Sequence, residues 1–371
     1  MQPDAEGFLF PRVDAEKCIH CRKCLTHCSG CQDLQSAGAV PEQGYIALSK
    51  NAELERLSAS GGVFAALAEA LLKEGGCRVY GAAIDDSAAK VCHIAIDSPE
   101  DLPRLQNSKY VQSDTQAVFK QVREDLAASR KVLFSGTPCQ VAALRSFLQK
   151  DDSNLFTIDI ICHGVPSPAF YERNVEEISR FFSSGLRQLR FRSRVEGKWN
   201  SLYSFYLKLA DGKEYQIGAQ FSPYYSTFQK GYALRESCYR CPFAQKRRMG
   251  DWTIGDCDSH AAYPQFFPAH SNSALLINSE KGRAFWVKYQ DLFHFSPLDI
   301  DLEAAHNKQL AAPFPRPAIR DEFYKIVQDS SWQALTDRFA RRWNWQNRFR
   351  YWIIFLLPSS VLGLKKKIFR R

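Results

Sequence analysis

Hydrophobic and polar residues alternate along this chain with two different periods, and each period predicts a different kind of element. Over residues 61–74 the apolar side chains recur every three or four positions, which is the spacing of a helix with one buried face. Ser58 or Ser60 is the expected N-cap of this helix, and the glycine pair at 75–76 is expected to end it.

Strand patterns alternate with helix patterns through the middle of the chain. Residues 77–85 and 91–97 have the pattern of a hairpin or of neighbouring sheet edges, and a helix is predicted over 116–128. Residues 131–150 contain a short apolar strand, a Gly-Thr-Pro turn and a helix, and 154–170 repeat the passage from strand to loop. Because such alternation is typical of parallel sheets, we predict an α/β fold with a mostly parallel sheet flanked by helices.

Longer strands interrupt this alternation at about 186–220. They are expected to form an antiparallel insertion, and Asp211-Gly212 is a hairpin turn signal between two of its strands.

The 371 residues are enough for two or three domains. Residues 1–50 contain a dense group of cysteines, 51–300 carry the alternating strands and helices, and 301–371 have a helical pattern. We therefore expect an N-terminal module, a central α/β domain and a helical C-terminal region.

The formal net charge is +9, but the excess of Arg and Lys is crowded at the C-terminal end. This pattern indicates a local basic tail and argues against a nucleic-acid-binding surface. A secreted disulfide scaffold is also excluded, because the chain is long and its first residues are acidic, without a long apolar run. The twelve cysteines are expected in a reducing cytoplasm, as ligands or in the core.

Five cysteines fall within fourteen residues near the N-terminus. Cys18, Cys21, Cys24 and Cys28 have the C-x2-C-x2-C-x3-C spacing that binds [4Fe-4S] clusters in bacterial ferredoxins. Zinc usually takes two pairs of ligands separated by a longer loop. The spacing therefore predicts a small ferredoxin-like iron–sulfur module over residues 1–50.

The role of the fourth cysteine in this run has two interpretations. In two-cluster ferredoxins the last cysteine of such a run binds the other cluster, and Cys31 makes a further C-x2-C pair with Cys28. Cys28 either completes the first cluster or joins Cys31, Cys238 and Cys241 around a second one. A structural turn is the alternative for Cys238 and Cys241.

Two predicted strands end in loops that carry a cysteine, at the sheet edge where ligands usually bind. Cys139 starts a helix, where the dipole lowers a thiol pKa, so it is a redox thiol, a ligand or a small residue beside a cofactor. His163 follows Cys162 and either delivers a proton to a reduced substrate or forms a structural hydrogen bond. Cys139, Cys162 and His163 are the catalytic candidates.

Several motifs taken together resemble a known family. In chain order they are SASGGVF, SKYVQSD, FSGTPCQVAAL, DIICHGVPSP and CYRCPFAQKRRMGDWTIGD. The series is similar to the beta subunits of deazaflavin-reducing (coenzyme F420) hydrogenases and dehydrogenases. That group includes chlorophyll-pathway reductases and proteins associated with bacterial surface-polysaccharide synthesis.

The resemblance implies an oxidoreductase in which a [4Fe-4S] cluster passes single electrons to FAD and the flavin delivers a hydride. It also implies that the FAD diphosphate lies at the start of the helix after SASGG. The implied cofactor-binding residues are Ser58, Ser60, Gly61, Gly62, Ser108, Lys109, Tyr110, Gly136, Thr137 and Pro138.

Two features depart from the family pattern. Polysaccharide-associated relatives open with two ferredoxin runs, whereas this chain has one, so both one and two clusters stay open. Cys257 and Asp258 follow TIGD where the family has an aromatic residue and Trp, which implies a different pocket or a further ligand at Cys257.

Near the C-terminus an apolar stretch, YWIIFLLPSSVLGL, is too short to span a bilayer. Its basic and Trp-rich flanks predict either a segment lying on an anionic membrane surface or a helix packed on the protein's own core. The expected location is the cytoplasm, with peripheral contact at the inner face of the membrane under the first alternative.

The leading functional hypothesis is a reductase that takes electrons from ferredoxin or a similar donor and reduces an organic substrate, such as a sugar or lipid-linked glycan precursor. The second hypothesis is a deazaflavin-dependent oxidoreductase. The third is an electron-transfer subunit of a larger complex without a substrate of its own.

Overall fold

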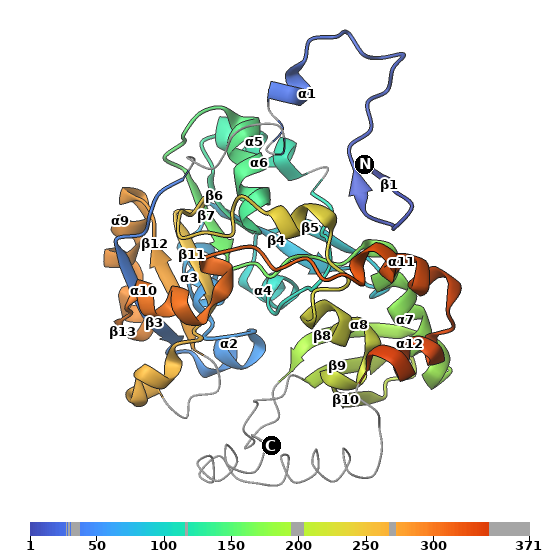
Figure 1. Cartoon of the computed structure of the whole chain (residues 1–371). Helices are drawn as coiled ribbons and strands as arrows, with labels where there is room; N and C mark the ends of the chain where they lie inside the picture. The colour runs from blue at the N-terminus through green and yellow to red at the C-terminus, as the bar shows by residue number, and fades with distance from the viewer. Residues whose placement is uncertain are drawn as a thin grey trace.

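The strands of the chain form a large sheet, a small sheet and an N-terminal hairpin (Figure 1). The computed structural model describes residues 1–26, 28, 30, 38–115, 118–193, 204–266 and 272–340. Cys31 and the apolar C-terminal tail therefore lie outside the described residues. Within them, no helix is both long enough and apolar enough to cross a membrane.

The large sheet has eight strands. In spatial order they are β13 (Phe293–Pro297), β3 (Gln43–Ser49), β12 (Ser273–Ile277), β11 (Trp252–Asp256), β7 (Leu155–Ile160), β6 (Lys131–Gly136), β4 (Cys77–Ile84) and β5 (Val91–Ile96). The four central strands from β11 to β4 are parallel, which confirms the predicted parallel sheet at its centre. The outer pairings are antiparallel, including the hairpin of β4 and β5.

Helices cover both faces of this sheet. The helices are α2 (Ala52–Leu57), α3 (Val63–Glu74), α4 (Leu102–Leu105) and α9 (Glu280–Tyr289) on one face, and α5 (Val118–Ala127) and α6 (Pro138–Leu148) on the other. The short α10 (Ile300–His306) packs beside β3 and β12. The predicted helix over 61–74 is thus confirmed as α3, and Gly75 ends it.

The expected N-cap of α3 is wrong. Gly62, with φ 79°, occupies that position. The Ser58 hydroxyl instead donates to the Leu54 carbonyl, 2.7 Å away, at the end of α2, and the Ser60 hydroxyl pairs with that of Ser273 at 2.9 Å. Both serines therefore hold the α2–α3 loop in place.

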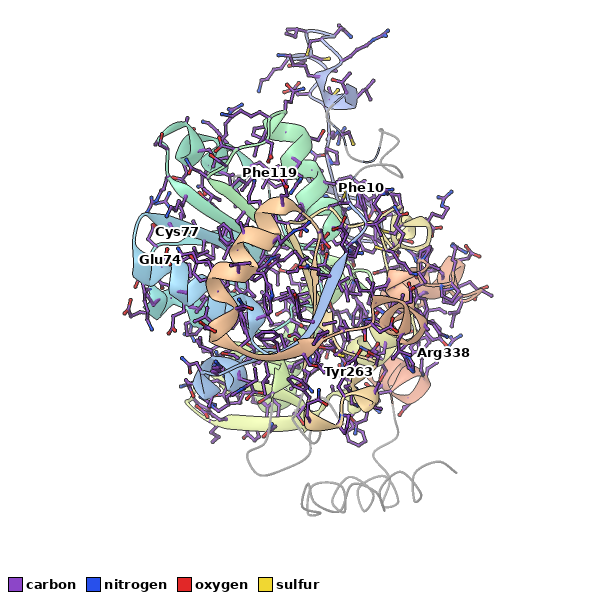
Figure 2. The ribbon with its side chains drawn as sticks, turned by 90° about the vertical axis from the view of Figure 1, so that its left-hand side faces the viewer. Phe10, Glu74, Cys77, Phe119, Tyr263 and Arg338 are labelled. Carbon is purple, nitrogen blue, oxygen red and sulfur yellow. The ribbon has the colours of Figure 1, made fainter. Side chains whose placement is uncertain are left out.

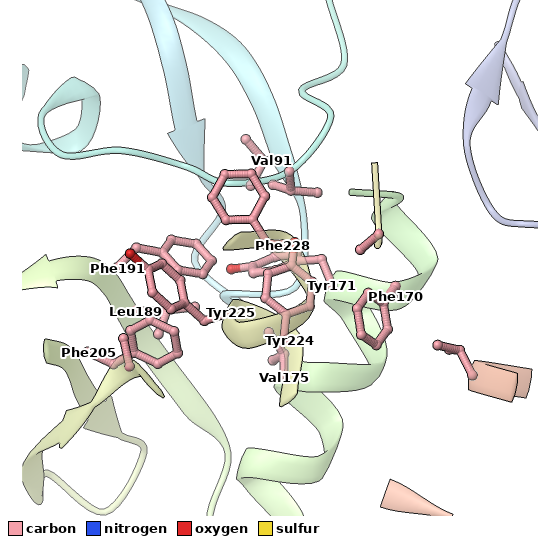
Figure 3. Packing of buried hydrophobic residues seen from close by; sticks show 14 of the residues in the cluster. Val91, Phe170, Tyr171, Val175, Leu189, Phe191, Phe205, Tyr224, Tyr225 and Phe228 are labelled. Carbon is pink, nitrogen blue, oxygen red and sulfur yellow. The ribbon is translucent and has the colours of Figure 1, made fainter. Parts of the chain in front are cut away.

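The predicted antiparallel insertion is confirmed as the small sheet. Its strands are β8 (Leu186–Ser193), β9 (Ser204–Leu209) and β10 (Glu214–Gly218), with Gly212 at φ 86° in the turn between the last two. The surrounding helices are α7 (Pro168–Phe182), α8 (Pro223–Gln229), α11 (Arg320–Asp329) and α12 (Trp332–Phe339). Aromatic side chains fill the core between them (Figure 3).

The N-terminal hairpin of β1 (Gln2–Pro3) and β2 (Leu9–Phe10) lies against these helices. Buried Phe8 contacts the Tyr324 ring edge-on at 5.4 Å. Beyond the hairpin, α1 (Lys23–Thr26) stands apart from both sheets in two views (Figures 1 and 2). Because β3 belongs to the large sheet, the segment that stands outside it ends before residue 43.

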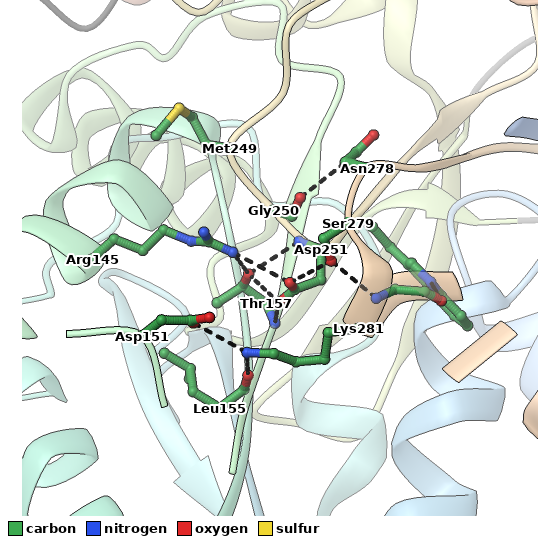
Figure 4. Close-up of polar contacts among 12 residues, drawn as sticks. Arg145, Asp151, Leu155, Thr157, Met249, Gly250, Asp251, Asn278, Ser279 and Lys281 are labelled. Atoms are coloured by element: carbon green, nitrogen blue, oxygen red, sulfur yellow. Dashed lines mark hydrogen bonds and ion pairs between the residues drawn. The ribbon is translucent and has the colours of Figure 1, made fainter. Parts of the chain in front are cut away.

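Two buried acids connect β7 to the segment that precedes β11. Asp251 accepts hydrogen bonds from the Thr157 amide and hydroxyl, each at 2.8 Å, and from Ser279 at 2.7 Å (Figure 4). Asp159 pairs with Arg248 at 3.3 Å, with both side chains at most 1% exposed. Arg248 is therefore a structural residue and is not available to a phosphate- or carboxylate-bearing ligand.

Replacing Arg248 by Met should lower the free energy of unfolding by about 3–5 kcal/mol, because it leaves the Asp159 carboxylate buried without its counter-ion. Urea denaturation measures the change. The control Arg240→Met removes an exposed arginine from the same region and should change stability by no more than about 0.5 kcal/mol. Equal losses in the two variants would show that the buried pair has no special weight.

Candidate functional site

Four cysteines from three segments gather at the carboxyl ends of β6 and β7. Cys139 is the second residue of α6, Cys162 follows β7 by two residues, and Cys238 and Cys241 lie in and just after the 3-10 helix η3 (Glu236–Arg240). Burial raises the pKa of Cys162 well above its ordinary value, and the other three thiols raise it further. Cys238 has its pKa raised to about 12, again by burial first and then by Cys139 and Cys241.

Hydrogen-bond donors surround the sulfur atoms of this group. Backbone hydrogen bonds from Gly164 and Val165 lower the pKa of Cys162 and Cys238 respectively, against the effect of burial. Cys241 has two such backbone bonds, from the residues that follow it, and Cys139 Sγ lies 3.0 Å from Thr137 Oγ1. Hydrogen bonds to sulfur are one means by which proteins tune iron–sulfur sites.

Arg248 and Gly164 hold two of the three segments together. Arg248 donates to the Phe243 carbonyl at 3.1 Å and to the Ile160 carbonyl at 2.9 Å, so it ties the loop after Cys241 to the end of β7. Gly164 has φ 119°, and a Cβ there would lie 2.8 Å from Leu234 and 3.2 Å from the Cβ of Cys238. Only glycine permits this close approach.

Four cysteine thiols are the donor set that an iron–sulfur cluster takes. Zinc needs thiolates about 2.3 Å from one point, and no group of three His, Cys, Asp or Glu within the described residues is arranged to hold a metal ion. A cubane cluster spreads its four cysteine ligands over its corners. In addition, the Nε of Arg235, whose charge acts on Cys238 and Cys139, is buried without a hydrogen-bond partner in the described part of the chain. The sulfur atoms of a cluster are acceptors for such a donor.

The predicted metal ligands of the N-terminus are a separate set. Cys21 and Cys24 are exposed, and Cys18 and Cys28 are partly buried, on the segment around α1. The residues on either side of Cys21, His20 and Arg22, have φ 53° and 58°, an uncommon conformation for non-glycine residues that occurs in anion-binding loops.

The second C-x2-C pair lies beside two other thiols. Cys238 and Cys241 lie with Cys139 and Cys162; one of the two interpretations of the sequence joined them to Cys28 and Cys31, the latter outside the described residues. Sequence spacing alone did not reveal this, because the three segments meet only through the strand order of the sheet.

The predicted flavin residues of SASGG lie at the edge of the large sheet where the parallel strands have their carboxyl ends, because Ser273, the partner of Gly61, pairs with the last residue of β11. Gly61 donates its N–H to the Ser273 hydroxyl at 2.9 Å, and a Cβ on Gly61 would lie 2.2 Å from the Ala47 carbonyl oxygen. Gly62 has no side chain to cap α3, so the first N–H groups of this helix are available to an anion.

Lys109 is held by the end of α4 on the large sheet, and Tyr110 contacts α8 beside the small sheet. Lys109 Nζ donates to the carbonyls of Leu105 and Gln106 at 2.9 and 2.6 Å, and burial lowers its pKa to about 7. The Tyr110 ring stacks on Phe228 at 4.6 Å. Ser108 precedes Lys109 and is half-buried.

The remaining predicted cofactor residues form the turn between β6 and α6. Gly136 is the last residue of β6. Thr137 is the N-cap of α6 and forms a reciprocal pair of hydrogen bonds with Gln140, and Pro138 is the first residue of the helix. The turn therefore sets the direction in which Cys139 leaves the sheet.

His163 has contacts that favour its structural alternative over proton delivery. Its Nε2 donates to the Phe228 carbonyl at 3.2 Å, and its ring packs edge-on against Phe228 and Phe314. Burial lowers its pKa, so the ring is neutral at pH 7.

Cys257 is buried, and its thiol donates a hydrogen bond to the Glu303 carboxylate, with Sγ and Oε2 3.6 Å apart. Burial raises the pKa of this thiol, and Glu303 raises it further. Cys257 is therefore a neutral core thiol and supports the loop after β11.

Comparison with known proteins identifies a family and solved structures that resemble this chain. Residues 129–299 match the family described as the C terminus of the coenzyme F420 hydrogenase/dehydrogenase beta subunit. A chain of the F420-reducing [NiFe] hydrogenase complex from Methanosarcina barkeri has a TM-score of 0.50 and 17% sequence identity, over 79% of this chain and 92% of that one. At this identity the likeness shows the fold alone. No curated protein matches the sequence.

One residue that sequence reasoning passed over supports the Gly-Thr-Pro turn. His93 on β5 donates from Nε2 to the Ser135 carbonyl at 3.0 Å, and its Nδ1 lies 2.8 Å from the Ser113 hydroxyl. Its ring is 5% exposed, and burial lowers its pKa to about 4 from an ordinary 6.5.

Wild-type stability should therefore fall as the pH falls from 6.5 towards 4, because the unfolded chain binds a proton that the folded His93 resists. Between pH 7 and pH 5 the loss due to this residue is about 2 kcal/mol. His93→Gln should be free of that loss in urea denaturation at the two pH values, and exposed His294→Gln should keep it. The same pH dependence in His93→Gln and wild type would refute the assignment.

Proposed function

Through residues 129–299 the chain belongs to the family of coenzyme F420 hydrogenase/dehydrogenase beta subunits, and on that premise we propose that it is an iron–sulfur flavoprotein oxidoreductase. In this proposal it takes electrons from ferredoxin or a similar one-electron donor and reduces an organic substrate.

The observation that carries the proposal is the group formed by Cys139, Cys162, Cys238 and Cys241. Backbone N–H groups donate to three of these thiols, and the Thr137 hydroxyl lies beside the fourth, Cys139. Four cysteine thiols are the ligand set that a [4Fe-4S] cluster would take. Such a cluster supplies one-electron transfer. The chain's own residues hold the ligands in place, exclude water from one side and donate hydrogen bonds to sulfur.

The N-terminal run would hold a second cluster through Cys18, Cys21, Cys24 and Cys28. The exposure of Cys21 and Cys24 suits a point where a protein donor delivers electrons. The hairpin before this run contacts the four-cysteine site, because the guanidinium of Arg235 lies 3.9 Å from the centre of the Phe10 ring.

The uncapped start of α3 and Lys109 support the proposed FAD site. Backbone N–H groups at a helix N-terminus suit a diphosphate, and Gly61 lets the loop pass close to β3. Lys109 donates to two carbonyls, which leaves one ammonium proton for an acceptor on the cofactor. Ser60 and the Thr137 turn border the same edge of the sheet.

A deazaflavin is the second candidate substrate, favoured because the similar hydrogenase complex is F420-reducing. A sugar or lipid-linked glycan precursor remains the first candidate on the motif resemblance. Membrane contact would involve the tail outside the described residues.

Iron analysis of cysteine variants tests the two-cluster proposal. Cys162→Ser or Cys241→Ser should each lower the iron content of anaerobically purified protein by about half, because these residues bind one cluster. Cys18→Ser or Cys21→Ser should each remove the other half of the iron, because those residues bind the second cluster. Cys92→Ser on β5 is the control and should keep all the iron. Full iron in Cys162→Ser would refute the ligand assignment.

Rapid-mixing spectroscopy tests the substrate. Protein reduced by ferredoxin should show flavin reoxidation when a nucleotide sugar or lipid-linked sugar is added under argon. Reoxidation by a deazaflavin alone would establish the second candidate. Reoxidation by neither, together with a stable complex with another redox protein, would contradict both and identify an electron-transfer subunit.

A further inference from the structure

Arg235 is attached by its backbone to two of the segments that carry the four cysteines. Its N–H donates to the Val165 carbonyl at 2.9 Å, and its own carbonyl accepts from the Cys238 amide at 2.8 Å. Val165 follows Cys162 by three residues, and Cys238 follows Arg235 by three. The backbone of Arg235 is therefore fixed relative to ligands on both sides.

The side chain of Arg235 packs on an aromatic ring of the N-terminal hairpin. Its guanidinium carbon is 3.9 Å from the centre of the Phe10 ring, a distance typical of a cation–π contact. The charge of Arg235 acts on Cys238 and Cys139, and the acid within its electrostatic reach is Asp4. Asp4 lies in the turn of the β1–β2 hairpin that leads to the N-terminal cysteines.

The Nε of Arg235 is buried and has no hydrogen-bond acceptor among the described residues. Arg235 as a whole is half-buried, and its neighbours Leu234 and Tyr239 are buried, so solvent screens the guanidinium less than it would screen a fully exposed charge. A buried N–H needs a partner, and the sulfur atoms of a bound cluster can accept from it.

A positive charge in this place changes the energy of electron uptake. A [4Fe-4S] cluster with four thiolates is negatively charged, and gaining one electron adds one negative charge without making or breaking a bond. A nearby cation in a low-dielectric site stabilises the reduced form more than the oxidised form, and so raises the reduction potential.

We propose that Arg235 is a positioning residue that raises the reduction potential of the cluster held by Cys139, Cys162, Cys238 and Cys241, with Phe10 holding its guanidinium in place. This inference rests on the proposed function. It adds that the hairpin before the N-terminal cysteines, through Phe10, influences the reduction potential of the four-cysteine cluster, which would accept electrons from the N-terminal cluster.

A redox titration followed by electron paramagnetic resonance tests the proposal on the full-length, anaerobically purified protein. Arg235→Gln should lower the midpoint potential of the four-cysteine cluster by at least about 59 mV. This shift corresponds to a tenfold change in the one-electron equilibrium constant. The N-terminal cluster, identified by its loss in Cys21→Ser, should keep its midpoint and serves as the internal reference.

Two matched variants separate charge from other effects. Arg240→Gln removes an exposed arginine from the same 3-10 helix and should change the midpoint by less than a third as much, because water screens it. Arg235→Lys keeps the charge and should keep most of the wild-type midpoint. An Arg235→Lys midpoint as low as that of Arg235→Gln would overturn the charge argument.

Failure of the proposed function is distinguishable from failure of this inference. Unchanged iron content and an unchanged spectrum in Cys238→Ser would show that these four cysteines do not bind a cluster, and the proposed function would then fail. Loss of that signal in Cys238→Ser, together with a wild-type midpoint in Arg235→Gln, would overturn only the role of Arg235.

A further variant covers the case in which Arg235→Gln does not assemble the cluster. Phe10→Leu leaves the arginine in place but opens it to water. The midpoint potential should therefore fall by the amount that corresponds to a two- to fivefold change in the one-electron equilibrium constant. An unchanged midpoint in Phe10→Leu with full iron would then overturn the proposal.

Discussion

The buried ion pair of Arg248 and Asp159 is the interaction on which the candidate site depends. Both side chains are at most 1% exposed, and a buried pair is tolerated only when further hydrogen bonds satisfy its remaining atoms. Here the Asp159 carboxylate also accepts from the Met249 and Gly250 amides at 2.9 and 3.1 Å, and Arg248 donates to three carbonyls. The result is a rigid connection between the end of β7 and the loop after Cys241.

That connection explains why three distant segments present their thiols together. Cys139 and Cys162 follow adjacent parallel strands, so the sheet itself brings them close. Cys238 and Cys241 belong to neither strand, and they reach the same edge because Arg248 and the close approach at Gly164 hold their loop there. The core thus determines the geometry of the site, and its loops carry the reactive atoms.

Local patterns in the sequence predicted local features. The helix at α3, the hairpin of β4 and β5 and the insertion around Gly212 follow from periodicity and turn residues within short windows. The predicted N-cap, Ser58 or Ser60, was wrong because two serines and two glycines compete for one position. Gly61 packs against Ala47 and Ser273, which leaves Gly62 as the N-cap, and no short window contains those contacts.

By itself, the sequence determined which residue types are available for redox chemistry and the kinds of element that carry them, and its residues 129–299 match a family of coenzyme F420 hydrogenase/dehydrogenase beta subunits. Only the tertiary structure decided the partners: Cys238 and Cys241 lie with Cys139 and Cys162, Arg248 lies in the core, and His163 is held by Phe228. The physical reason is that contacts between distant segments depend on strand order and on buried polar pairs, which a one-dimensional pattern does not encode.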